Sequence, residues 1–127
     1  MKKFILLFIL QMVSFSLFAK EPGLNVERLF DGSYNDNESV TLNIMKSQEK
    51  YFRGFTVTQN KKVMDKVSQL FEKDLSRASR TQDIISNGSH FRSMTVINNG
   101  EEIYVGLSYD GRDGCYLFIS GPMKAFK

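Results

Sequence analysis

The sequence predicts an α+β protein with two layers, in which one long helix lies across one face of an antiparallel sheet of about five strands. Three observations lead to this prediction. Residues 60–78 show helical periodicity, runs of alternating apolar and polar residues stand before and after them, and an Asn-Gly pair separates two of those runs. The expected element order is ββαβββ, preceded by a short N-terminal helix.

The first 19 residues have the layout of a secretory signal peptide. Lys2 and Lys3 precede an almost wholly apolar run over residues 4–18, and Ala19 is a suitable cleavage point. A helix of about 15 residues reaches only about 22 Å, which is short of the ~30 Å hydrocarbon core of a bilayer. We therefore expect an exported protein, periplasmic or secreted, in which residues 20–127 form a single domain with no stable membrane span after cleavage. An uncleaved anchor is the alternative, because Leu17 is larger than the residue that signal peptidase prefers there.

The charge balance argues against nucleic-acid binding. Two of the 17 Lys and Arg residues lie in the leader, which leaves 15 basic side chains against 14 acidic ones in residues 20–127. A nearly neutral domain without a long basic stretch lacks the positive surface that binds nucleic acid. We therefore expect no nucleic-acid partner.

The domain begins with a short predicted helix over residues 24–30 and a polar loop over residues 31–39. Two alternating segments follow, residues 40–45 and 51–58, joined by a turn. Their aliphatic side chains share one face if the turn has four residues. The pairs are then Val40 with Val57, Leu42 with Phe55, and Ile44 with Arg53.

The long predicted helix carries one apolar stripe, which we expect to face the sheet. Asn60 can cap its first turn. Asp74 interrupts the stripe, and because an unpaired buried carboxylate is too costly, we expect it to pair with Arg77, Arg53 or Arg92. A functional carboxylate is the alternative. The stripe consists of Val63, Met64, Val67, Leu70, Phe71, Leu75 and Ala78.

The second block of strands starts after a polar connection over residues 79–89. Asn99-Gly100 lies between two alternating runs, the usual signature of a type I′ hairpin. The expected pairs are Val96 with Ile103, Met94 with Val105, and Arg92 with Leu107. A turn over residues 110–114 leads into the last strand, residues 115–120. Its length allows two registers, so either Tyr116 and Phe118 or Leu117 and Ile119 face the core.

The face of the sheet that lies away from the long helix is unusually aromatic. It receives Met45, Phe52, Phe91, Ile97, Tyr104 and one register of the last strand. Either the N-terminal helix with Leu29 and Phe30 covers this face, or a partner does. The candidate binding residues are Phe52, Phe91, Tyr104 and Tyr116. The arrangement, with the first strands beside the last, resembles profilin-like and longin-like sheets, which indicates topology and not function.

Metal and cofactor sites have little support. Residues 31–42 start like a calcium loop, but Asp36 stands where an EF-hand needs Gly and Leu42 where it needs Glu. The chain has one His and one Cys, too few for a zinc site, and no glycine cluster opens the long helix. We expect no cofactor and no metal.

Two functional alternatives remain beside a binding module. A small hydrolase-like enzyme would use His90, Cys115 and Asp74, with Cys115 or a serine as nucleophile and His90 as base. A structural envelope subunit would use Cys115, which has no intramolecular partner, to bridge two chains.

The segments LNVERLFDGSY (residues 24–34) and FEKDLSRAS (residues 71–79), with strands between them, resemble a family of small secreted proteins of unknown function from gut Bacteroidetes. The resemblance covers most of the domain and implies a periplasmic or surface location. It transfers no functional residues. Our leading hypothesis is an exported, non-enzymatic binding module that uses the second sheet face or a strand edge, with another envelope protein or a peptide as its partner.

Overall fold

The computed structural model describes residues 23–34, 38–47, 49–110 and 113–126. The expected signal peptide, residues 1–19, lies outside the described residues. The elements follow along the chain as η1 (Asn25–Phe30), β1 (Val40–Lys46), β2 (Lys50–Thr58), α2 (Lys61–Leu75), β3 (Ala78–Ser86), β4 (Ser89–Asn98), β5 (Glu101–Asp110), β6 (Gly114–Pro122) and η2 (Met123–Phe126).

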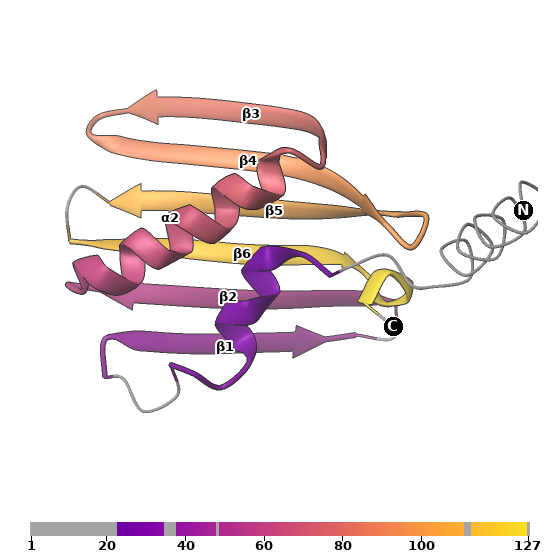
Figure 1. The fold of residues 1–127 in the computed structure, drawn as a ribbon, viewed down its shortest axis with the longest axis horizontal. Coiled ribbons are helices and arrows are strands. Elements are labelled where there is room, and N and C mark those ends of the chain that lie inside the picture. Colours follow the sequence, from indigo (N-terminus) through magenta and orange to yellow (C-terminus); the bar gives the residue numbers. More distant parts are fainter. Residues whose placement is uncertain (1–22, 35–37, 48, 111–112, 127) are drawn as a thin grey trace, which may run out of the picture.

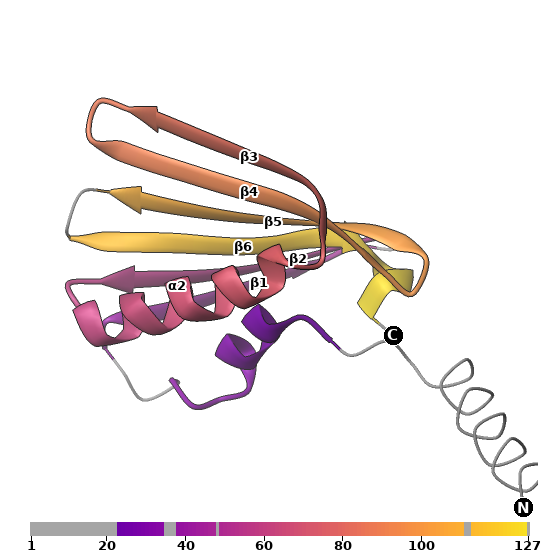
Figure 2. The same cartoon turned by 45° about the horizontal axis from the view of Figure 1, so that its top comes forward.

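The strands form one antiparallel sheet in the order β1-β2-β6-β5-β4-β3, with α2 across one face (Figure 1). The first two strands lie beside the last one, as predicted. The sheet is strongly twisted, so that β3 and β4 splay away from β1 and β2 (Figure 2). The predicted α+β architecture of two layers is therefore confirmed.

The predicted number of strands is wrong, because the sheet has six strands and not about five. The additional strand is β3, most of which lies in the segment predicted as a polar connection. It is an edge strand, exposed along nearly its whole length. Its sequence therefore lacks the alternation of apolar and polar residues that burial of one face imposes.

The predicted registers of both hairpins are confirmed. Ile44 pairs with Arg53 in the first hairpin, and Arg92 pairs with Leu107 in the second. The open register of the last strand is also resolved, because Leu117 and Ile119 are fully buried under the helix. Tyr116 and Phe118 therefore lie on the opposite face of the sheet.

α2 forms because its apolar stripe can cover the sheet and because Asn60 caps its first turn. The side-chain oxygen of Asn60 accepts a hydrogen bond from the amide of Val63. Nδ2 of the same side chain donates a hydrogen bond to the hydroxyl of Ser39, the residue just before β1. The helix ends at Leu75, earlier than predicted, and Ala78 begins β3 instead. The buried core joins α2 to β2, β4, β5 and β6, with Phe55, Phe71, Leu70, Ile103, Leu107 and Leu117 among its largest members.

The N-terminal helix lies beside α2 on the same face of the sheet (Figures 1 and 2). It is a 3₁₀ helix, and it ends in Phe30, whose ring meets Phe55 edge to face at a centroid distance of 5.9 Å. Tyr34 meets the same ring at 5.6 Å. The expectation that this helix could cover the second sheet face is therefore wrong.

The short C-terminal helix η2 closes one end of the same layer. Asn98 at the end of β4 donates a hydrogen bond of 2.9 Å to the carbonyl of Ala125, and the Phe126 ring contacts Tyr51. Within the described part of the chain, no helix has the length and apolar character needed to cross a membrane.

Candidate aromatic binding face

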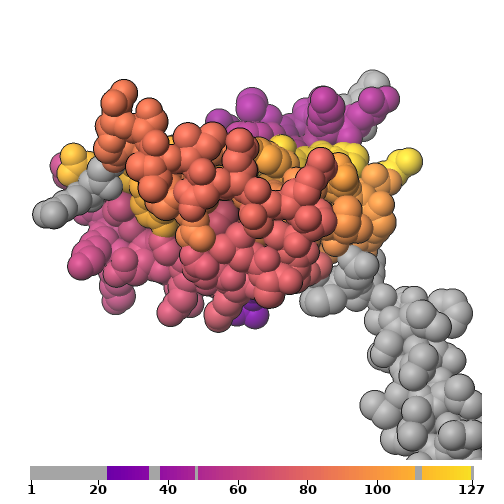
Figure 3. Space-filling view, turned by 90° about the horizontal axis from the view of Figure 1, so that it is seen from above, coloured from indigo at the N-terminus to yellow at the C-terminus, as the bar shows by residue number. Residues whose placement is uncertain are grey.

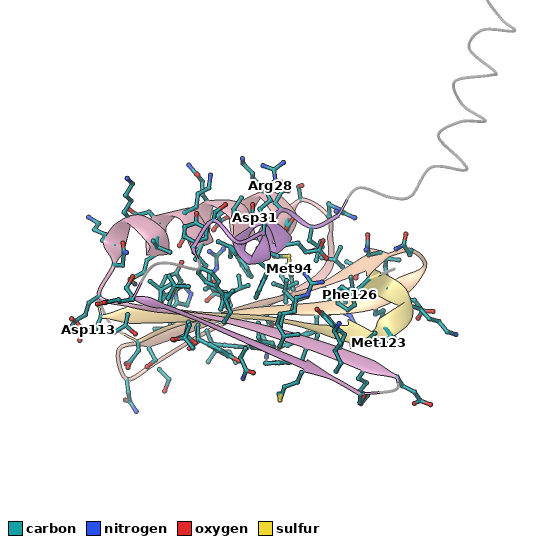
Figure 4. All side chains as sticks on the ribbon, turned by 90° about the horizontal axis from the view of Figure 1, so that it is seen from below. Arg28, Asp31, Met94, Asp113, Met123 and Phe126 are labelled. Carbon is teal, nitrogen blue, oxygen red and sulfur yellow. The ribbon has the colours of Figure 1, made fainter. Side chains whose placement is uncertain are left out.

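The second sheet face carries five half-buried aromatic side chains, which we call the aromatic face: Phe52, Phe91, Tyr104, Tyr116 and Phe118. They come from β2, β4, β5 and β6. Figure 4 shows α2 and η1 together on one side of the sheet, and only side chains on the other side. Among the described residues, no helix lies over the aromatic face.

Phe118 is the centre of the aromatic face. The rings of Phe52 and Phe91 are nearly parallel to it, at centroid distances of 6.0 and 6.4 Å. Tyr104 and Tyr116 flank it at 5.6 and 6.0 Å. The four residues predicted as binding residues are thus brought together around a fifth residue, Phe118, which lies two residues after Tyr116 on the same face and was not among the predicted binding residues.

Two glycines make room for these rings on the sheet. Gly106 is the cross-strand partner of Phe118, and a Cβ at that position would collide with Cε1 and Cζ of the Phe118 ring. A Cβ at Gly54 would lie 2.8 Å from the hydroxyl oxygen of Tyr116. Both rings therefore lie against backbone that carries no side chain. The glycine opposite the aromatic position was the sequence signal that could have identified Phe118.

A groove of about 1000 Å³ crosses the same face at the end of the sheet where β2 begins and β6 ends. Phe52 and Tyr104 lie along it, and hydroxyl groups of β4 and β6 lie between and beside the rings. The charges at the two ends balance, because Lys50 adjoins Glu49 at one end and Arg80 contacts Glu102 at 3.3 Å at the other. The side chains that line it include Lys50, Phe52, Arg80, Gln82, Ser93, Thr95, Glu102, Tyr104, Ser120 and Pro122.

The groups proposed for an enzyme do not form one site. His90 and Cys115 lie on β4 and β6, and Tyr109 of β5 is paired with both. Two strand spacings separate them by about 10 Å, beyond hydrogen-bond reach. His90 lies near the start of β4, whereas Asp74 lies near its end. Arg77, one helical turn after Asp74, donates a hydrogen bond to Asn98, the last residue of β4.

Cys115 lacks the environment of a nucleophile. Its side chain is buried among apolar neighbours, and this burial raises its pKa to about 11. The thiolate, which is the reactive form, is therefore scarce near neutral pH. Burial, followed by the charge of Cys115, raises the pKa of Tyr109 to about 12, and the Tyr109 hydroxyl is hydrogen-bonded to Ser68. His90 is engaged with Asp83 of the neighbouring strand.

Asp74 is fully buried, as its place in the apolar stripe requires, but its hydrogen bonds come from η1 and not from the expected arginines. It accepts hydrogen bonds of 2.8 and 2.9 Å from the backbone amide and side-chain amide of Asn25, and of 2.9 Å from the amide of Val26. Arg92 instead forms an ion pair with Glu72. The Arg53 guanidinium lies over the rings of Tyr51, Phe30 and Phe126, a cation–π arrangement.

A metal site finds no support in the described part of the chain, where no three His, Cys, Asp or Glu side chains come close enough to share an ion. Residues 35–37 of the calcium-like loop lie outside the described residues.

Comparison with models of known protein families gives a match over most of the chain. A family of unknown function (DUF6108) matches residues 12–109. No curated protein and no solved structure shows a significant match.

Proposed function

The chain belongs to the DUF6108 family of unknown function, and we propose that it is a non-enzymatic binding module that receives its partner on the aromatic face. The observation that carries this proposal is the set of half-buried rings around Phe118, to which η1 and α2 contribute no cover. Clusters of this kind on a soluble domain usually mark a binding surface.

The partner that fits this surface best is a segment of polypeptide, supplied by another envelope protein or by a free peptide. Ring faces supply contact area at low entropic cost, and the hydroxyl and amide groups of Gln82, Thr95 and Ser120 can bind peptide groups of the partner. The charges along the groove balance, so a neutral segment suits it better than a strongly charged one.

The sequence of residues 1–19 supports export of this module, because a basic start, an apolar run and Ala19 match a secretory signal. We therefore place the binding event in the periplasm or outside the cell. The unreactive environment of Cys115 favours a binding role over thiol catalysis. The burial of Cys115 also disfavours the structural-subunit hypothesis in which it bridges two chains.

An array of peptides tiled across the envelope proteins of the producing cell tests the proposal. The wild-type protein should bind a subset of these peptides, and Phe52→Ala or Tyr104→Ala should weaken that binding by about tenfold or more, as loss of a central aromatic contact does. Lys62→Ala, on the exposed side of α2, is the matched control and should bind like wild type. The proposal fails if no peptide binds, or if the two ring variants bind as tightly as the control.

A further inference from the structure

Four of the five exposed large apolar side chains among the described residues lie on the two edge strands of the sheet, and the fifth, Ile97, lies on β4. Ile44 and Met45 on β1 are 51% and 56% exposed, and Ile84 and Ile85 on β3 are 45% and 76% exposed. Figure 3, which looks onto the β3 edge, shows this strand without another element over it. An edge strand that is long, uncovered and apolar is a template for pairing with a further strand.

Each edge presents one of these side chains on each face of the sheet. A row of cross-strand partners on the helix-covered face runs through Ile44, Arg53, Ile119, Val105, Met94 and Thr81. Ile85 lies four residues after Thr81 and shares this face with Ile44. The row of partners on the aromatic face runs through Met45, Phe52, Ser120, Tyr104, Thr95 and Arg80. Ile84 follows Arg80 by four residues and shares this face with Met45.

We propose that copies of this chain join edge to edge, with β3 of one copy pairing antiparallel to β1 of the next. A single register then places Ile85 opposite Ile44, Ile84 opposite Met45, and Asp83 opposite Lys46. In each pair both members lie on the same face of the extended sheet. The two side chains of each aliphatic pair therefore cover one another, and the two side chains of the third pair carry opposite charges. The contact spans five residue pairs, from Gln82–Ser47 to Ser86–Asn43.

The backbone geometry is compatible with this register. The sheet has six antiparallel strands, so its two edge strands run in opposite directions, and a second copy placed in the same orientation adds an antiparallel neighbour. The side to which a residue directs its amide and carbonyl depends on strand direction and on the face of its side chain. Ile44 and Ile85 have their side chains on the same face, and their strands run in opposite directions. The amide and carbonyl groups of both residues therefore point away from the sheet, or those of both point into it. Two residues that lie opposite each other in an antiparallel pair must match in this way.

Pairing between two identical edges matches the side chains less well. If two β3 strands align Ile84 with Ile84, each Asp83 faces Ile85. If two β1 strands align Ile44 with Ile44, Met45 faces Asn43 and Lys46 faces Leu42. The β3–β1 contact is therefore favoured, and because it joins different surfaces it repeats head to tail and does not stop at a dimer.

The charged pair supplies the sharpest test. Asp83 is 58% exposed although it contacts His90. Lys46 is also exposed, although its ammonium group lies 5.3 Å from the centroid of the Tyr51 ring. Both charges are therefore available to a neighbouring copy at the outer edges. In sedimentation velocity, the purified protein should form larger species as its concentration rises. Asp83→Lys alone and Lys46→Asp alone should each raise the concentration needed for assembly by about tenfold, because like charges then face each other.

An equimolar mixture of Asp83→Lys and Lys46→Asp should restore assembly, because each mutated edge meets a complementary one. Asp65→Lys, on the exposed side of α2, makes the same change in charge away from both edges and should assemble like wild type. A wild-type protein that stays monomeric at all concentrations overturns the proposal, as does a mixture that assembles no better than its components.

Cross-linking separates the proposed contact from pairing of identical edges. Under mild oxidation, Ile44→Cys mixed with Ile85→Cys should give a linked dimer, whereas each variant alone should not; native Cys115 is buried and serves as an internal control. Linkage of Ile85→Cys to itself would indicate β3–β3 pairing and contradict the proposal. Asp83→Lys should leave peptide binding at the aromatic face unchanged, so the two proposals fail independently.

Discussion

Asp74 is a buried charge that fixes the position of a second element. Its carboxylate accepts three hydrogen bonds from Asn25 and Val26, which are the first residues of η1. Hydrogen bonds to an ionised acceptor are stronger than neutral ones, and here they satisfy two amides at a helix start. The residue that interrupts the apolar stripe of α2 is therefore structural.

Replacing Asp74 with Ala should lower the free energy of unfolding by about 1–3 kcal/mol, because the buried amide of Val26 and the partly buried amide of Asn25 lose their acceptor. Urea denaturation measures this change, and hydrogen exchange at the Val26 amide should accelerate. Glu72→Ala, which removes an exposed ion pair with Arg92, is the control and should cost less than about 1 kcal/mol. Equal costs for the two variants would show that the hydrogen bonds to η1 are not important.

Cys115 should make the protein less stable at high pH. Its folded pKa of about 11 exceeds the unfolded reference value of 9.0. The neutral thiol is thus favoured by folding, so its contribution is complete below pH 9 and is lost as the pH rises towards 11. The loss due to Cys115 should be of the order of 2 kcal/mol.

Urea denaturation between pH 8 and pH 11 in a reducing buffer measures this loss. Cys115→Ala should show a smaller decline than wild type between pH 9 and pH 11. Tyr109, whose folded pKa of about 12 exceeds its reference value of 10.0, contributes a further decline between about pH 10 and pH 12 in both proteins, so the difference between them between pH 9 and pH 10 reports most directly on Cys115. Identical declines for wild type and variant would mean that Cys115 ionises as easily in the folded protein as in the unfolded chain.

At the scale of the strands, the aromatic face depends on the pairing of Gly106 with Phe118. Gly106→Ala should displace the Phe118 ring and lower the free energy of unfolding by about 1–3 kcal/mol, because the new methyl group occupies the space of the ring. In a Phe118→Ala background the same substitution should cost much less. A double-mutant cycle by urea denaturation measures this coupling, and purely additive costs would contradict the packing of the ring on the glycine.

Strand pairs and the helix stripe could be predicted because burial of one face imposes a periodic sequence. The Asn99-Gly100 turn set the register of β4 and β5, and the apolar steps from Val63 to Phe71 set the face of α2. β3 could not be predicted in this way, because an exposed edge strand carries no such pattern. The side of the sheet chosen by η1 was also open, since it depends on hydrogen bonds to Asp74, which is distant in the sequence.

The candidate site was predicted in part. Alternation along β2, β4 and β5 was sufficient to place Phe52, Phe91 and Tyr104 on one face. Tyr116 and Phe118 lie two residues apart and share a face in either register, so the register of β6, which the length of the preceding turn left ambiguous, decides whether both join Phe52. The position of the groove depends on the twist of the whole sheet, and a linear pattern of residues does not specify it.

As a whole molecule, the described chain has one closed side and one open side. α2, η1 and η2 bury the apolar residues of one sheet face, and the aromatic face opposite them has no described element over it. Joined through β3 and β1, successive copies would present their aromatic faces on the same side of one extended sheet. Such an array would bind a partner with several matching segments more tightly than a single copy does.

The division of the sheet into a closed, helix-covered face and an open, aromatic face is tested most directly by the free energy of unfolding of two double variants. Phe52→Asp with Tyr104→Asp should remain folded, with a loss of about 1–2 kcal/mol from the ring contacts that each makes. Val67→Asp with Leu70→Asp, at fully buried positions of α2, should not fold, because two charges would be buried without partners. The account is contradicted if the first pair of substitutions unfolds the protein, since the aromatic face would then belong to the core, or if the second pair leaves it folded.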